Sequence, residues 1–199
     1  MFHLDPLALQ GQRIGLLGGS FDPPHQGHVH ITRWALRTFK LDQVWWIVSP
    51  GNPLKAHGPA EMSRRLAACR QVMRHPRVKI TDLEARLGCQ YTADTLERIA
   101  TRYPGTRFAW LMGADNLAGF HRWERWDWIM AHFPVGVLAR PGEQLHAGLA
   151  PVTRRFGRWR LPQHAAACLT DGPTPRWALM TGAMSTSSST AIRARGDWP

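Results

Sequence analysis

Short apolar runs alternate with segments of helical length along most of the chain, and this alternation restricts the fold more than any other feature of the sequence. The runs that are apolar enough to be buried strands cover residues 13–17, 44–48, 78–81, 107–112, 135–139 and 177–180. Strands separated by helices form βαβ units, in which neighbouring strands run parallel. The sequence therefore predicts an α/β fold of the Rossmann-like, doubly wound type with a mostly parallel sheet.

Helical spacing is visible between these runs. Ile31, Ala35, Leu36 and Phe39 recur at the helical period after the first run. The same period predicts helices over residues 62–73, 92–103 and 126–132. Residues 141–175 are rich in proline, glycine and arginine, so we expect a surface excursion there with one or two short helices.

The composition fits one globular domain. Of 199 residues, 44% are apolar and 20% are charged, and we expect a domain over residues 13–199 after an extension of residues 1–12. No apolar run approaches the ~20 residues that span a bilayer, and the first residues lack the basic region of a signal peptide. The three cysteines stand far apart in no paired spacing. We therefore expect a cytoplasmic protein without a membrane segment or a disulfide framework.

The charge balance points to an anionic partner. Lysine plus arginine number 25 against 14 acidic residues, a net charge of +11. Nucleic acid, a membrane surface or a phosphorylated small molecule would each suit this charge, although solvated arginines would explain it too. Residues 154–160 (RRFGRWR) interleave arginines with aromatic rings, as some strand-binding proteins do. They also fit a surface segment, so we expect nucleic acid not to be the partner.

The segment over residues 18–28, GGSFDPPHQGH, joins the first strand to the first helix. Its two glycines, Gly18 and Gly19, let a ligand approach the backbone closely, and a helix start attracts phosphate. His25 and His28, three residues apart, can face one point there and donate hydrogen bonds to a phosphoryl oxygen. A histidine metal pair or a simple helix cap are the alternatives that the residues leave open.

This segment resembles the G-G-T-F-D-P-x-H-x-G-H signature of the HxGH nucleotidyltransferase superfamily. Ser20 replaces the commoner threonine and keeps the hydroxyl group. The resemblance implies that His25 and His28 contact a triphosphate and stabilise the pentacoordinate α-phosphorus. It also assigns four preceding residues to the ATP site: Gly18, Gly19, Ser20 and Phe21.

Two further segments narrow the resemblance. The GADN segment of residues 113–116 follows a predicted strand, where Asp115 could contact ribose or adenine or could cap the next helix. The SSTAIR segment of residues 188–193 offers hydroxyl groups and an arginine at a predicted helix start. Together they resemble the G-x-D-N/S and I-S-S-T-x-I-R motifs of bacterial nicotinate-nucleotide adenylyltransferases, with a departure at Ser187. By that resemblance Gly113 and Asp115 border the adenosine, and the ATP phosphates contact Ser188, Thr190 and Arg193.

The resemblance also implies an acceptor site. Backbone amides at Tyr91 and Thr92, before a predicted helix, correspond to those that bind the pyridine carboxylate in that family, and a helix start favours such an anion. Trp123 corresponds to the tryptophan that stacks on the nicotinate ring, although most of the ten tryptophans must serve packing. Lys55 lies on a P-x-x-P-x-K-like loop and is assigned to the same acceptor site.

The reaction that the resemblance implies is adenylyl transfer from ATP to nicotinate mononucleotide, which yields deamido-NAD and pyrophosphate in NAD biosynthesis. We expect Mg²⁺ to be carried by the ATP phosphates, because this ion prefers phosphate oxygens and water to an all-protein site. No protein metal site is expected. The same chemistry on nicotinamide mononucleotide, or on another phosphorylated acceptor, is the alternative.

Overall fold

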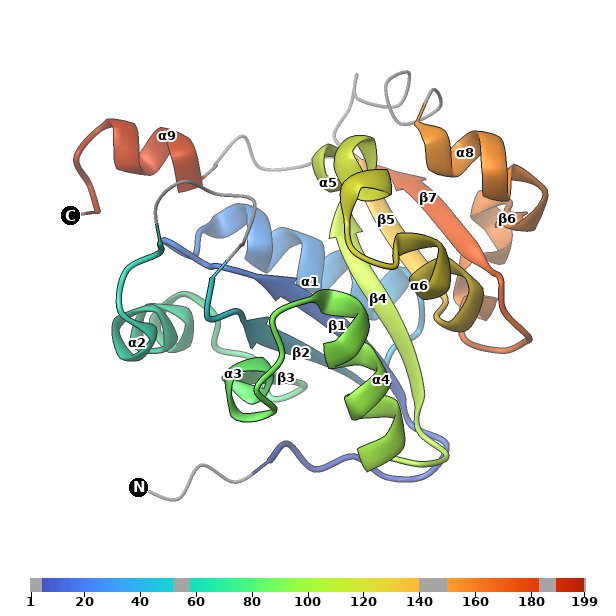
Figure 1. Ribbon diagram of the computed structural model, residues 1–199, viewed down its shortest axis with the longest axis horizontal. Coiled ribbons are helices and arrows are strands. Elements are labelled where there is room, and N and C mark those ends of the chain that lie inside the picture. The colour runs from blue at the N-terminus through green and yellow to red at the C-terminus, as the bar shows by residue number, and fades with distance from the viewer. Residues whose placement is uncertain (1–4, 52–57, 140–149, 183–188, 199) are drawn as a thin grey trace.

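The computed structural model describes residues 5–51, 58–139, 150–182 and 189–198. A seven-stranded parallel sheet has the order β3-β2-β1-β4-β5-β7-β6 (Figure 1). Its strands are β1 Arg13–Gly19, β2 Gln43–Val48, β3 Val78–Thr81, β4 Arg107–Gly113, β5 Val135–Ala139, β6 Arg160–Leu161 and β7 Trp177–Thr181. The predicted α/β doubly wound fold is confirmed.

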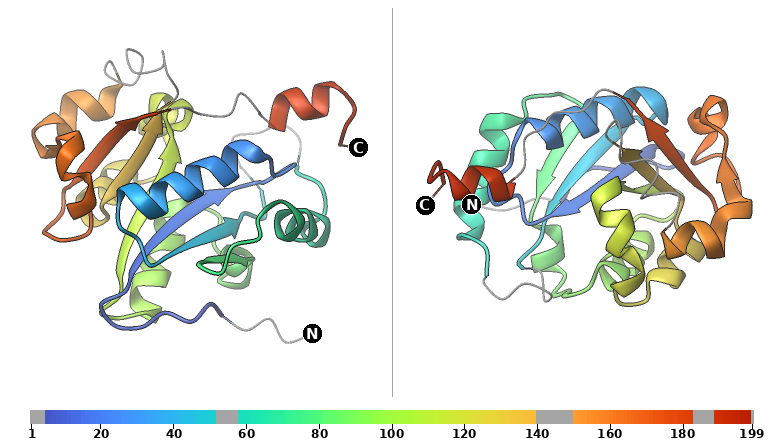
Figure 2. Two further views of the ribbon diagram at one scale, coloured as in Figure 1. Left: turned by 180° about the vertical axis from the view of Figure 1, so that it is seen from behind. Right: turned by 90° about the horizontal axis from the view of Figure 1, so that it is seen from above.

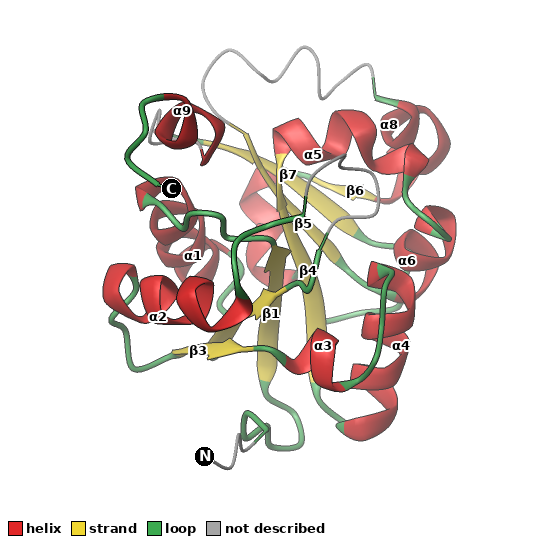
Figure 3. Cartoon of the chain, turned by 60° about the vertical axis from the view of Figure 1, so that its left-hand side comes forward, coloured by secondary structure: helices red, strands yellow, loops and turns green. Residues whose placement is uncertain are grey.

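Helices lie on both faces of this sheet, as Figures 2 and 3 show. The α-helices are α1 Gln26–Thr38, α2 Met62–Val72, α3 Leu83–Arg86, α4 Thr92–Arg102, α5 Ala114–Gly119, α6 Trp126–His132, α8 Pro151–Phe156 and α9 Ser189–Ala194. Short 3-10 helices cover Phe120–Arg122 (η1), Gly157–Trp159 (η2) and Gln163–Cys168 (η3). Helices α1 and α2 cover one face, and α3, α4 and α6 cover the other.

Each face of the sheet has its own core. Successive side chains of a strand point to opposite faces, so Leu16 of β1 packs with the α4 side while its neighbour Leu17 packs with the α1 side. In β2 the same alternation sends Trp45 to the first core and Trp46 to the second, and both side chains are fully buried. A parallel sheet that is buried on both faces explains why its strands read as continuous apolar runs.

The predicted elements match the structure closely, with a few differences, among them the short helix α3, which was not predicted. Strand β1 continues through Gly18 and Gly19, so these glycines end the strand, whereas the sequence placed them in the segment that follows it. Within the described part of the 141–175 stretch, the chain forms α8, η2 and η3 and also β6, which was not predicted. Two residues are too short a strand to leave a period in the sequence.

The chain before β1 packs onto the domain. Asp5 forms ion pairs with Arg86 and Arg102, and the Gly11 amide donates a hydrogen bond of 2.8 Å to the Gly105 carbonyl. The boundary at residue 13 stays a prediction. No helix among the described residues is long and apolar enough to cross a membrane.

The order of the strands reverses between β1 and β4, and this reversal predicts a ligand crevice there. From β1 the chain builds β2 and β3 on one side and then returns to build β4 on the other side. In open parallel sheets, ligands bind beyond the carboxyl ends of the strands at such a reversal. Gly19 ends β1 and Gly113 ends β4, so both glycine-containing motifs lie at this crevice.

Candidate active site

His25 and His28 lie side by side at the start of α1, with ring centroids 3.9 Å apart. His25 is the N-cap, and its Nδ1 accepts a hydrogen bond of 3.1 Å from the Gly27 amide. The His25 amide in turn donates to Nδ1 of His28 at 3.2 Å. The two rings therefore cap helix α1 and also lie together at the end of β1. A role as helix caps is compatible with the proposed contact to a phosphoryl oxygen, because each ring still has a second nitrogen atom.

These caps fix where each neutral imidazole carries its proton. An Nδ1 atom that accepts a main-chain N–H must be unprotonated, which leaves the proton on Nε2. Burial, followed by the charge of His25, lowers the pKa of His28 to about 3. His28 is therefore neutral at pH 7 and presents an N–H donor, although a bound polyanion would favour its charged form.

An aromatic stack supports His28 from the sheet side. Phe21 adopts a left-handed backbone with φ of 47°, is buried, and stacks on Trp46 of β2 at 4.8 Å. The His28 ring lies 4.7 Å from Phe21. Trp46 Nε1 donates to the Thr32 hydroxyl at 2.7 Å, and that hydroxyl donates to the His28 carbonyl at 2.8 Å. Sequence reasoning assigned no role to Trp46 or Thr32.

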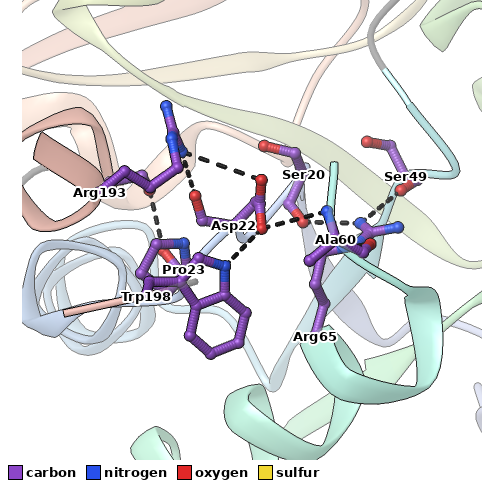
Figure 4. A network of polar contacts seen from close by, with 9 residues as sticks. Ser20, Asp22, Pro23, Ser49, Ala60, Arg65, Arg193 and Trp198 are labelled. Atoms are coloured by element: carbon purple, nitrogen blue, oxygen red, sulfur yellow. Dashed lines mark hydrogen bonds and ion pairs between the residues drawn. The ribbon is translucent and has the colours of Figure 1, made fainter. Parts of the chain in front are cut away.

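A buried arginine joins residues 18–28, called the histidine segment below, to the chain after β2 (Figure 4). Arg65 of α2 is only 2% exposed, and its guanidinium donates to the carbonyls of Ser20 and Ser49 at 2.7 Å each. It also donates to the Ala60 carbonyl at 2.6 Å. Nothing in the sequence distinguished Arg65 from the other arginines, because its partners lie up to 45 residues away.

Helix α9 sits against the same segment. Arg193 donates a hydrogen bond to the Asp22 carbonyl, and its guanidinium lies 4.0 Å from the Asp22 carboxylate. The Ser189 hydroxyl donates to the Pro23 carbonyl at 2.8 Å. Arg193 is thus next to the histidine segment, as expected for a shared site, and Thr190 is exposed on α9. Ser188 and Lys55 lie outside the described residues.

The remaining predicted residues lie at the starts of α4 and α5. Gly113 is the N-cap of α5, and Asp115 lies exposed in its first turn. Asp115 is therefore not the cap of that helix. Tyr91 is the N-cap of α4, with 38% of its surface exposed, and Thr92 is the first residue of that helix.

Trp123 is connected to the histidine segment through a second indole. The Trp123 ring meets Trp110 of β4 edge to face at 6.2 Å and Phe120 at 5.1 Å. A Cβ atom on Gly18 would lie 2.3 Å from Cη2 of Trp110, so only glycine leaves room for this ring. The contacts of Trp110 therefore connect Gly18 at the end of β1 with Trp123.

Among the described residues, no group of three or more histidine, cysteine, aspartate or glutamate side chains is arranged to hold a metal ion. What the crevice offers instead is a set of N–H donors, an arginine and helix starts, all of which suit an anion.

The doubly wound sheet and the imidazole pair capping the first helix define an α/β nucleotidyltransferase. The chain belongs to the cytidylyltransferase-like family, whose model matches residues 16–195, and within it to the nicotinate-nucleotide adenylyltransferases.

Similar proteins support this assignment. Two relatives, each named "Probable nicotinate-nucleotide adenylyltransferase", come from Cereibacter sphaeroides and Roseobacter denitrificans. The first is 60% identical over 93% of this chain and 98% of its own, and the second is 54% identical over 97% of each. A solved Plasmodium falciparum nicotinic acid mononucleotide adenylyltransferase, in complex with NaAD, shares the fold with a TM-score of 0.68 at 15% identity. That match covers 92% of this chain and 83% of the other.

Proposed function

We propose that this protein transfers AMP from ATP to nicotinate mononucleotide and forms deamido-NAD and pyrophosphate. The observation that carries the proposal is the pair of imidazoles at the crevice between β1 and β4. Both are held by main-chain N–H groups so that Nε2 carries the proton. The names of the relatives at 54–60% identity support the choice of substrates.

In this proposal the phosphate of the mononucleotide attacks the α-phosphorus of ATP in line. One P–O bond forms while the bond from the α-phosphorus to the bridging oxygen breaks, and pyrophosphate leaves with that electron pair. The attacking phosphate is already ionised at neutral pH, so the reaction needs positioning and charge stabilisation rather than a strong base. The Nε2–H groups of His25 and His28 donate to the phosphoryl oxygens, where negative charge increases.

The ATP site in this proposal is assembled around the histidine segment. Arg193 would pair with the phosphates, because its guanidinium already lies beside that segment. The assigned ATP-binding residues are Gly18, Gly19, Ser20, Phe21, His25, His28, Gly113, Asp115, Ser188, Thr190 and Arg193. Mg²⁺ would arrive with the triphosphate and offset its charge, because this ion prefers phosphate oxygens and water to an all-protein site.

The acceptor site in this proposal lies at the start of α4 and at Trp123. The amides of Tyr91 and Thr92 would bind the pyridine carboxylate, and a helix start prefers this acid to the uncharged amide. Trp123 would stack on the positively charged pyridine ring. Lys55 is assigned to the same site. We also propose that residues 13–199 form the catalytic domain and that the protein acts in the cytoplasm.

The test is pyrophosphate release with a panel of acceptors. Purified protein, ATP and Mg²⁺ would be mixed in turn with nicotinate mononucleotide, nicotinamide mononucleotide and phosphopantetheine, with CTP replacing ATP in a second series. We expect release with ATP and nicotinate mononucleotide to exceed every other combination. Higher kcat/KM with the amide would move the proposal to that acceptor, and no release with any pyridine nucleotide would refute it.

A further inference from the structure

Asp22, which neither the histidines nor the phosphate contacts require, lies at the centre of a polar network (Figure 4). Its Oδ1 accepts a hydrogen bond of 2.7 Å from the indole N–H of Trp198 and one of 3.3 Å from the Ala60 amide. Its main-chain carbonyl accepts from Arg193. Asp22 therefore contacts three parts of the chain: the residues before α2 through Ala60, helix α9 through Arg193, and the residues after α9 through Trp198.

Trp198 is held from two sides. Its N–H binds Asp22, and the guanidinium of Arg64 lies 4.1 Å from its ring centroid, a cation–π arrangement. The two partners belong to different parts of the chain, the histidine segment and α2. A tryptophan that is fixed in both ways anchors the residues after α9 to the phosphate side of the crevice.

Helix α9 needs such an anchor. It is only six residues long, and isolated helices shorter than about 12 residues are marginal in water. Its position must therefore come from tertiary contacts. Those described are the Ser189 hydroxyl on Pro23, the Arg193 guanidinium on Asp22 and, four residues after the helix, the Trp198 indole on Asp22.

The residues that accept these contacts are held by other parts of the chain. Arg65 holds the Ser20 and Ser49 carbonyls on either side, and it is buried near the Asp22 carboxylate, whose negative charge opposes the lowering of the Arg65 pKa by burial. Asp22 thus faces Arg65 on one side and Arg193 on the other. Its carboxylate also accepts the hydrogen bonds from the Ala60 amide and the Trp198 indole, so Asp22 is the point at which α9 and its following residues meet the histidine segment.

We propose that Asp22 and Trp198 are positioning residues for the ATP site: the indole of Trp198 latches the segment after α9 onto Asp22, which sets Arg193 against the histidine segment. The inference rests on the proposed adenylyl transfer, because Arg193 is taken to bind the ATP phosphates. Neither residue need touch a substrate. Loss of this contact should weaken the binding of ATP alone, whereas a general loss of stability would affect both substrates.

The first test is Trp198→Phe, which keeps an aromatic ring near Arg64, although a smaller one, and removes the N–H donor. Trp159→Phe is the matched control, because Trp159 also lies under an arginine, with Arg158 at 3.8 Å, and is outside the site. We expect Trp198→Phe to raise KM for ATP about tenfold, the change expected for losing a hydrogen bond to a charged acceptor. KM for the acceptor should stay within error, and the control should match the wild type.

A double-mutant cycle sharpens the test. Asp22→Ala removes the acceptor of the indole N–H, so adding Trp198→Phe to it should raise KM for ATP no further. Additive effects would mean that the two residues act separately and would overturn the latch. An unchanged KM for ATP in Trp198→Phe would overturn it too, as would parallel losses of both substrates together with a lower thermal midpoint.

Failure of the latch is distinguishable from failure of the proposed function. Calorimetric binding of a nonhydrolysable ATP analogue needs no turnover and compares Trp198→Phe with the wild type directly. A wild type that binds the analogue but releases no pyrophosphate refutes the proposed function, while the ratio of the two binding constants still decides the latch. We expect that ratio to be about ten as well, and a ratio of one would refute the latch.

Discussion

The proposed phosphate end and the proposed acceptor end of the site are held in place by different kinds of contact. At the phosphate end, hydrogen bonds fix His25, His28 and Asp22, and buried Arg65 ties their segment to its neighbours. At the acceptor end, Trp123 is placed by aromatic rings that meet edge to face. Directional bonds hold one end, and packing holds the other.

The difference matches what each end has to do. In-line attack on phosphorus tolerates little error in the position of a donor, and hydrogen bonds weaken steeply when they are misaligned. A flat pyridine needs a flat partner, which aromatic packing supplies with some tolerance in position. Substitutions at the phosphate end should therefore lower turnover, whereas those at the acceptor end should mainly weaken binding.

The largest effect is expected at His28. His28→Ala removes a donor to the reacting phosphoryl group, so kcat should fall by roughly 10²–10³, the usual loss for one such donor. Steady-state pyrophosphate release measures this, with His30→Ala on the same helix as the control, since His30 packs near Trp34 instead. An unchanged kcat would remove His28 from the mechanism.

A smaller and different effect is expected at Trp123. Trp123→Ala removes the stacking face, so KM for nicotinate mononucleotide should rise about 30-fold, which corresponds to roughly 2 kcal/mol of cation–π and packing energy. KM for ATP and kcat should change little. Trp128→Ala is the control, because Trp128 stacks on His132. If Trp123→Ala left the acceptor KM unaltered, Trp123 would serve packing alone.

A substitution at Gly18 tests whether the two ends of the site are independent of each other. In Gly18→Ala the new methyl group would meet the Trp110 ring, and the ring would have to shift against Trp123. We expect KM for the acceptor to rise about tenfold, which corresponds to about 1.4 kcal/mol and lies within the 1–3 kcal/mol usual for overpacking. Adding Trp110→Phe, a shorter ring, should recover most of the loss. Without recovery, the effect of Gly18→Ala comes from the phosphate site instead.

The smallest effect on turnover is expected at Glu84, where a substitution should instead change the pH dependence of stability. The Glu84 side chain is buried in α3 near Thr95 of α4. Burial raises the pKa of Glu84 to about 7. The folded pKa exceeds the unfolded value, so the stability that Glu84 contributes is present in acid and is lost as pH rises toward 7. Glu84→Gln should therefore gain roughly 2 kcal/mol relative to the wild type between pH 5 and pH 8. Urea unfolding at both pH values measures this, and a constant difference between the proteins would refute the buried charge.

The fold was predictable because the strands appear in the sequence as short apolar runs and the long helices as apolar residues at the helical spacing. Strands β3 and β5 and helix α6 have the predicted bounds. In β5, burial on both faces makes the run apolar from end to end. The two-residue β6 pairs with β7 only in the folded chain and carries no such signal.

The site was predictable only where one short segment contains it. His25 and His28 stand within a single signature, whereas Asp22 and Trp198 are 176 residues apart in the hydrogen bond that joins them. Arg65 acts through main-chain carbonyls, whose positions depend on backbone conformation rather than on residue type. Contacts of this kind follow from the fold and cannot be read from local pattern.

The reciprocal caps of α1 have an evolutionary consequence. In many enzymes the groups that perform chemistry weaken the fold, so substitutions that remove them make the protein more stable. Here the same two rings complete the first turn of a long helix, and a cap contributes about 1 kcal/mol. Selection for a stable protein and selection for the proposed chemistry therefore act on the same two imidazole rings, through Nδ1 and Nε2 respectively, and drift toward a stable but inactive chain is opposed at both histidines.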